Sequence, residues 1–162
     1  MSAATPDSGP ASAGMRLARL IDALNETVGR WLSWLVLLAV LISAGNALVR
    51  KLFDNSSNAL LEIQWYLFAA LFLLGAGYTL LRQEHVKIDV LLQRFERRTQ
   101  VKVELFGIVC FLWPFAFAVI GLVWPLVARA FLSGEMSSNA GGLIRWPVYA
   151  LVPAGFLLLS LQ

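Results

Sequence analysis

Hydrophobic positions gather in four long runs of the chain, and short polar segments separate these runs. The hydrocarbon core of a bilayer is about 30 Å thick, and an α-helix crosses it in about 20 residues. Each run comes close to this length, and its centre carries no ionisable side chain. We therefore predict an all-α integral membrane protein whose membrane domain, 31–162, contains four transmembrane helices at about 31–49, 60–81, 105–128 and 146–162.

Two further segments have the spacing of amphipathic helices. Between the second and third spans, apolar residues recur at i, i+3, i+4 and i+7, as Ile88, Leu91, Leu92 and Phe95. This spacing places them on one helical face and predicts an interfacial surface helix at about 86–98. Residues 15–30 show a similar apolar face and predict an interfacial helix before the first span. In the alternative, residues 15–30 are simply an N-terminal extension of the first span.

The two ends of the chain have different characters. Residues 1–14 are mostly Ala, Ser, Gly, Pro and Thr, a composition typical of a disordered leader. They lack the basic start of a cleaved signal peptide, so we expect the first span to be retained. At the other end, the chain stops at Gln162 while still apolar, and we expect a natural chain to continue a short way past this point.

Composition and charge support the membrane assignment and add an orientation. The chain is 59% hydrophobic and 14% charged, whereas a soluble domain has about 45–50% and about 25%. Nine of the 13 basic residues lie before the first predicted span or between the second and third. Because cytoplasmic loops are rich in Lys and Arg, we expect both termini in the cytoplasm. The net charge of +3 then reflects topology, and we expect no nucleic-acid partner.

The chain is poor in the residues that carry chemistry. It has one His and one Cys, Cys110, so a two-histidine haem site or a disulfide within the chain is impossible, and nothing suggests a metal site. A self-contained pump or ion-coupled transporter usually needs charged groups at mid-membrane depth, and the spans lack them. We therefore expect no catalytic residue, no cofactor and no substrate pathway, but an accessory or scaffold subunit whose partner carries the pathway.

Three polar residues at the end of the second span form the best local constellation. Arg82, His85 and Asp89 stand at i, i+3 and i+7 if one helix continues through them. His85 and Asp89 are then an i, i+4 pair that could fix the corner between the span and the surface helix. In the alternative, all three are solvated residues at headgroup level.

Candidate contact residues lie on the second span and in the external loops. Gly75 and Gly77 are small enough to let another helix approach closely, so we assign them to packing against a partner subunit. We add Glu62, which lies near the start of the span and close to the headgroups. The loops near 51–58 and 133–145 face the outside in this topology, and Arg50, Lys51 and Arg145 are candidates for docking a binding protein.

These residues carry a resemblance to a known family. An acid that opens the second span, Gly75-Ala76 near its end, Arg82, and the corner His85-Val86-Lys87-Ile88-Asp89 resemble the DctQ component, the small membrane subunit of tripartite ATP-independent periplasmic (TRAP) transporters. The ending GGLIRWPVYALVPAGFLLLSLQ resembles the subgroup for mannitol, chloroaromatic or 2-oxo acid uptake. Many relatives have two acids where this chain has Leu61-Glu62.

The resemblance implies a place in a secondary transporter of the bacterial inner membrane. In this family a periplasmic solute-binding protein delivers organic acids or similar solutes to a heterodimer of small and large membrane subunits. The large subunit holds the sodium and substrate sites of the symport, and the small subunit braces it. Two alternatives from other classes are a membrane anchor of a redox enzyme, bound to quinone or haem, and a self-assembling channel or transporter. A haem spectrum would favour the first, and transport by this chain alone would favour the second.

Overall fold

The computed structural model describes residues 13–53, 57–82 and 95–162, and helices dominate this part of the chain. The one β-type pairing among these residues is an isolated bridge between Met136 and Ile144. The all-α class is therefore confirmed for the described residues. The helices are α1 (Ala13–Phe53), α2 (Asn58–Leu81), α4 (Arg97–Gly107), the π-helix η1 (Ile108–Leu112), α5 (Trp113–Ser133) and α6 (Trp146–Leu161).

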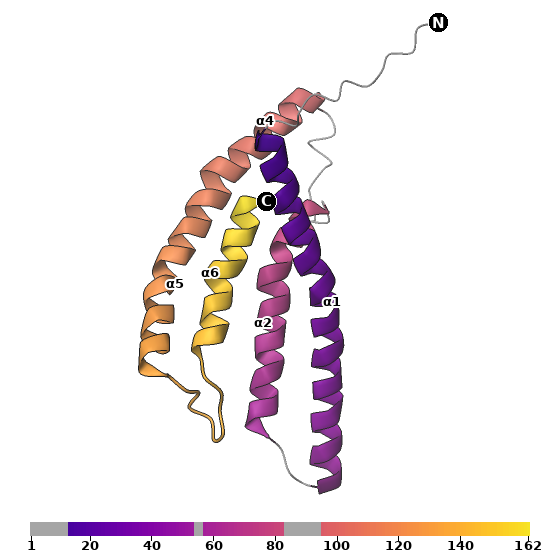
Figure 1. Ribbon diagram of the computed structural model, residues 1–162, viewed down its shortest axis with the longest axis vertical. Helices are drawn as coiled ribbons and strands as arrows, with labels where there is room; N and C mark the ends of the chain where they lie inside the picture. The colour runs from indigo at the N-terminus through magenta and orange to yellow at the C-terminus, as the bar shows by residue number, and fades with distance from the viewer. Residues whose placement is uncertain (1–12, 54–56, 83–94) are drawn as a thin grey trace, which may run out of the picture.

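Helices α1, α2, α6 and α5 stand in a row in this order (Figure 1). Each packs mainly on its neighbours in this row, α1 on α2, α2 on α6, and α6 on α5. The start of α1 and the C-terminal Gln162 lie toward one end of the row, which we call the terminal end (Figure 1). The segment that joins α5 to α6, residues 134–145, lies at the opposite end, which we call the hairpin end.

The row buries little of its own apolar surface. Among the described residues the buried hydrophobic side chains are Leu32, Ala39, Ala116 and Ala130, whereas Phe72, Leu122 and Leu132 are 74%, 80% and 84% exposed. A soluble monomer rarely exposes large continuous apolar surface, so lipid or another membrane subunit must cover these faces. The chain is a membrane-embedded, multi-pass protein.

Within the described part of the chain, three helical stretches are long and apolar enough to cross a bilayer, namely α1, α2 and the continuous stretch Arg97–Ser133. The predicted second span, 60–81, agrees with α2 almost to the residue. The predicted fourth span corresponds to α6, which is apolar but has 16 residues. A fourth crossing therefore stays a prediction.

Helix α1 is longer than the predicted first span, 31–49. It runs without interruption for 41 residues, which is about 60 Å at 1.5 Å per residue and about twice the hydrocarbon thickness. The predicted interfacial helix at 15–30 is thus continuous with the span, as in the alternative in which it extends the span. The predicted leader, 1–14, lies outside the described residues up to position 12, and Ala13 and Gly14 already belong to α1.

The third span also lies within a longer helical stretch. The predicted 105–128 falls inside α4, η1 and α5, which follow one another without a loop. The π-helix η1 has a local cause, because Pro114 has no N–H to offer the carbonyl of Cys110 four residues before it. Just before the proline, the Trp113 N–H donates five residues back, to the Ile108 carbonyl. Most of the predicted surface helix, 86–94, lies outside the described residues.

Close helix contacts depend on glycines. A Cβ at Gly155 in α6 would come within 2.7 Å of the carbonyl carbon of Leu73 in α2, and a Cβ at Gly77 would overlap the Asn25 side chain of α1. Gly77 therefore serves packing inside this chain, and Gly75 lies 3.3 Å from Leu32 by the same measure. The assignment of both glycines to contact with a partner subunit stays a prediction, now with an internal role for Gly77.

Candidate functional site

The segment 134–145 between α5 and α6 is an ordered hairpin, which we call the α5–α6 hairpin. Gly134 ends α5 in the left-handed conformation, with φ of 62°, which glycine adopts without strain. Inside the hairpin the Ser137 N–H donates to the Leu143 carbonyl over 2.8 Å, and the Arg145 N–H donates to the Glu135 carbonyl over 3.0 Å. These bonds and the Met136–Ile144 bridge give the loop a defined backbone.

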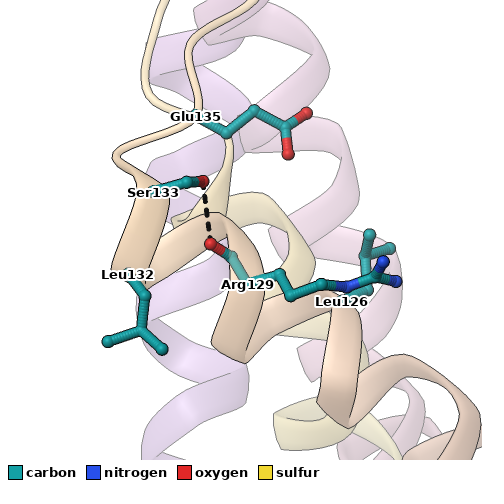
Figure 2. Close-up of a pocket in the computed structure, with 5 residues that line it drawn as sticks. All are labelled: Leu126, Arg129, Leu132, Ser133 and Glu135. Carbon is teal, nitrogen blue, oxygen red and sulfur yellow. Dashed lines mark hydrogen bonds between the residues drawn. The ribbon is translucent and has the colours of Figure 1, made fainter.

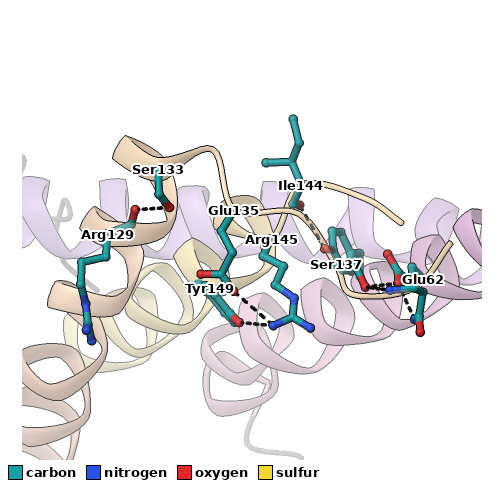
Figure 3. Close-up of polar contacts among 10 residues, drawn as sticks. Glu62, Arg129, Ser133, Glu135, Ser137, Ile144, Arg145 and Tyr149 are labelled. Atoms are coloured by element: carbon teal, nitrogen blue, oxygen red, sulfur yellow. Dashed lines mark hydrogen bonds and ion pairs between the residues drawn. The ribbon is translucent and has the colours of Figure 1, made fainter. Parts of the chain in front are cut away.

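The Glu62 carboxylate lies at the centre of the hairpin's contact with α2 (Figure 3). One oxygen, Oε1, accepts hydrogen bonds from Ser137 Oγ and from Asn139 Nδ2, the latter over 2.7 Å. The other, Oε2, accepts the Leu143 N–H over 2.7 Å. Glu62 is buried, with 9% of its surface exposed. Three donors therefore satisfy a carboxylate that would be costly to bury alone.

Two more residues of α2 extend this contact along the helix. Asn58 Nδ2 donates to the Ala140 carbonyl over 3.3 Å, and the Tyr66 hydroxyl donates to the Ile144 carbonyl over 3.0 Å. Asn58, Glu62 and Tyr66 stand four residues apart, so they share one face of α2. We call these three residues the hairpin anchor. They bind five positions of the hairpin and fix it against the first turns of α2.

Arg145, a predicted docking residue, is engaged within the chain (Figure 3). Its Nη1 donates to Glu135 Oε1 over 3.2 Å and lies 3.5 Å from the Tyr149 hydroxyl. The hydrogen bond to Glu135, followed by interaction with Tyr149, raises the pKa of Arg145 above its ordinary value. Arg50 and Lys51, the other two candidates, occupy the last turn of α1 and are exposed at the hairpin end.

Arg82, the first residue of the predicted corner, has partners that the sequence did not indicate. Its Nη2 lies 2.6 Å from Glu26 Oε1 of α1, and its guanidinium lies 5.4 Å from the centre of the Tyr78 ring. Tyr78 and then Glu26 raise the pKa of Arg82 above its ordinary value. His85 and Asp89 lie outside the described residues, so the corner they were expected to fix stays a prediction.

A polar cluster at the terminal end was missed by sequence reasoning. Asn25 is completely buried, and its Nδ2 donates to Gln162 Oε1 over 2.8 Å. Gln162 Nε2 in turn donates to Asp22 Oδ1 over 3.0 Å. The amphipathic pattern of residues 15–30 contained the signal, because Asp22, Asn25 and Glu26 all lie off its apolar face. In the structure this polar face meets α2 and α6, and apolar residues such as Leu20 point outward at 68% exposure.

The polar side chains of the described residues mainly contact other parts of the same chain. No group of three His, Cys, Asp or Glu side chains among them could hold a metal ion. The strongest polar arrangement is the hairpin anchor, whose carboxylate is occupied by hydrogen-bond donors of the chain itself. This arrangement can hold a loop in a fixed shape at one end of the helix row, which suits a surface for contact with another protein.

Comparison with known families gives one match. The family model described as "Tripartite ATP-independent periplasmic transporters, DctQ component" matches residues 39–162. This range includes residues 39–53 of α1, the hairpin anchor, the α5–α6 hairpin and α6. No curated protein was found to match the chain. No solved structure was found to match it either.

Proposed function

The chain belongs to the DctQ component family of TRAP transporters, and from this premise we propose that it is the scaffold subunit that braces the large transport subunit in the membrane. The family establishes the coarser role, the small membrane subunit of a transporter, and so confirms the resemblance read from the sequence. The subgroup for mannitol, chloroaromatic or 2-oxo acid uptake, the bracing and the docking are parts of the proposal.

The row of helices is the observation that carries the bracing role. Its neighbours pack in sequence, α1 to α2 to α6 to α5, and leave broad apolar faces uncovered. One face can contact the large subunit while the other contacts lipid. Two apolar grooves suit packing by partner side chains. One, of about 440 Å³, is lined by Trp31, Trp34 and neighbours, and the other, of about 290 Å³, by Trp124, Pro153 and neighbours.

The absence of charge in the middle of the spans supports the proposal that a partner subunit holds the transport pathway. Transporters place ionisable or strongly polar groups near the bilayer midplane, where they bind substrate and coupling ions. Here the uncharged stretches cover the centres of α1, α2, α5 and α6. We assign the sodium and substrate sites to the large subunit, in a sodium-coupled symport of organic acids, and no cofactor to this chain.

The ordered hairpin supports a docking role for the hairpin end. The excess of basic residues in the segments before the first predicted span and between the second and third favours an orientation with both termini in the cytoplasm of a bacterial inner-membrane protein. The α5–α6 hairpin, Arg50 and Lys51 then face the periplasm, where the solute-binding protein delivers its cargo. A hairpin fixed by three residues of α2 keeps its shape before the partner arrives, which lowers the entropic cost of docking.

Reconstitution tests the scaffold role. The large subunit and this chain, purified together and placed in liposomes, should take up solute when the binding protein and a sodium gradient are supplied. Liposomes with this chain alone should show no uptake, because its spans lack a polar pathway. Uptake by this chain alone, or full uptake by the large subunit without it, would contradict the proposal.

A further inference from the structure

A pocket of about 630 Å³ lies beside the end of α5, outside the hairpin anchor (Figure 2). It is lined by Leu126, Arg129, Leu132, Ser133 and Glu135. Figure 2 shows the Arg129 and Glu135 side chains extending to the same side of α5. The pocket thus combines apolar walls with a cation and an anion, and of its five lining residues only Glu135 belongs to the hairpin that the proposed function uses.

The depth of Arg129 places the pocket at the membrane surface. Residues 105–128 are uncharged, and Arg129 is the first charged residue after them. It stands one turn before Ser133, where α5 ends. An uncharged helical stretch of this length spans the hydrocarbon of about 30 Å, so the Arg129 guanidinium reaches the headgroup layer. The walls below it face acyl chains.

The charges around the pocket leave one cation without an anionic partner. Glu135 is paired with Arg145 over 3.2 Å. The Arg129 Nε donates to the Pro125 carbonyl over 3.4 Å, and among the described residues no carboxylate forms an ion pair with it. Figure 3 shows Arg129 apart from the pair of Glu135 and Arg145. Because Arg145 occupies Glu135, Arg129 is the charged group of the pocket lining that is left to pair with an added anion.

The apolar walls decide what kind of anion fits. Leu126 lies one turn below Arg129 on the same helix, and Leu132 beside it is 84% exposed. A soluble anion would satisfy Arg129 and leave both leucines uncovered. We propose that this pocket binds an anionic phospholipid, whose phosphate pairs with Arg129 and whose acyl chain packs on Leu126. Hydroxyl groups of a glycerol headgroup can donate to the free oxygen of Glu135 at the rim.

Native mass spectrometry with palmitoyl-oleoyl phosphatidylglycerol tests this site. The full chain, purified in detergent and delipidated, is titrated with the lipid, and the lipid-bound fraction is measured. Arg129→Gln should weaken the tightest binding step about tenfold, because a charge-assisted hydrogen bond to the phosphate is lost. Arg129→Lys should keep most of the binding. Arg50→Gln is the matched control, since it removes a cation at the same end but outside the pocket.

Several results would overturn the proposal. Unchanged lipid binding in Arg129→Gln would exclude the guanidinium, and an equal loss in Arg50→Gln would show a general charge effect. Binding of diolein, which has no phosphate, as tight as that of the phospholipid would exclude phosphate recognition. Unchanged lipid binding in Arg129→Gln together with loss of uptake driven by the binding protein would assign the pocket to an acidic protein partner instead.

Discussion

Glu62 receives hydrogen bonds from three groups of the α5–α6 hairpin, and each group needs a carboxylate oxygen in its present position. A glutamine at this position keeps one oxygen and replaces the other by an NH₂ group. The NH₂ would then face either the Leu143 N–H or the Asn139 amide donor, and donor would oppose donor. The hairpin therefore depends on the two acceptor oxygens of Glu62.

We expect Glu62→Gln to loosen the hairpin. Amide hydrogen exchange at Leu143 should become about tenfold faster, because the buried N–H loses a charged acceptor. The measurement is hydrogen–deuterium exchange with mass spectrometry on the detergent-solubilised chain. Glu26→Gln, which removes an acid at the terminal end, is the control and should leave exchange in 134–145 unchanged. Equal exchange rates at Leu143 in wild type and Glu62→Gln would refute this account of the anchor.

Arg82 pairs with Glu26 across α1 and α2, and this contact can be tested by exchanging the charges. Arg82→Glu alone brings two carboxylates together, with Asp22 nearby on the same pocket wall, so we expect less of the chain to co-purify with the large subunit. The double variant Arg82→Glu with Glu26→Arg should restore co-purification, because attraction returns. Failure of the double variant to recover would mean that Arg82 acts through other residues.

His85 and Asp89 carry a separate prediction that rests on their spacing. If the pair fixes the corner after α2, His85→Ala and Asp89→Ala should each reduce assembly with the large subunit or solute uptake. The checks are co-purification yield and initial uptake rate in proteoliposomes. Lys87→Ala serves as the control, because Lys87 lies between them in sequence but off the face that helical spacing predicts for them. Normal assembly and uptake in both variants would count against the corner.

At the scale of elements, the close approach of α2 and α6 can be tested at a single residue, Gly155. Gly155 of α6 faces the backbone of Leu73 in α2, where a Cβ would come within 2.7 Å of the carbonyl carbon. Backbone cannot move aside as a flexible side chain can, so a methyl group there must push the two helices apart. The row order depends on this approach, because α6 inserts between α2 and α5.

Gly155→Ala should therefore destabilise the fold by about 1–3 kcal/mol, the usual cost of overpacking. Thermal unfolding in detergent, followed by circular dichroism, measures the change. Gly121→Ala in α5 is a matched control, since its Cβ would meet nothing within 4 Å. It should leave stability unchanged or raise it by up to about 1 kcal/mol through helix propensity. Equal melting temperatures for both variants would show that α2 and α6 are not held at this distance.

At the scale of the whole molecule, the two ends of the row have different proposed tasks. The hairpin end carries the α5–α6 hairpin and, in the last turn of α1, the exposed pair Arg50 and Lys51. Most basic residues of the sequence lie before the first predicted span or between the second and third. Arg145 differs from the exposed pair, because its guanidinium is bound to Glu135 inside the hairpin. Charge reversal should separate residues that contact a partner from those that shape the surface.

We expect the double variant Arg50→Glu with Lys51→Glu to raise, severalfold, the binding-protein concentration that gives half-maximal uptake. The effect should shrink as salt is added, since exposed charges are screened. Arg145→Glu should instead speed hydrogen exchange across the hairpin, because it opposes Glu135. Uptake kinetics that do not respond to the double reversal would remove Arg50 and Lys51 from the docking surface.

The helical class and the positions of the hydrophobic spans could be predicted because hydropathy is read along the chain. The second span agreed with α2, and the family match confirmed the resemblance that motif residues such as Glu62 and Arg82 had indicated. Helix ends were predicted less well. The predicted third span begins at 105, but the helix already begins at Arg97 and includes Lys102, because a helix can extend into water beyond the bilayer.

The sequence by itself determined that this protein is a bundle of membrane helices with charge at its ends, because the cost of burying polar groups in lipid acts on each segment separately. Only the tertiary structure decided which polar side chains bond to one another. Glu62 bonds to residues 75 to 81 positions away, and Asn25 to Gln162 at 137. Such pairs depend on the order of α1, α2, α6 and α5 in the row, and that order follows from which faces pack closely, which no local pattern contains.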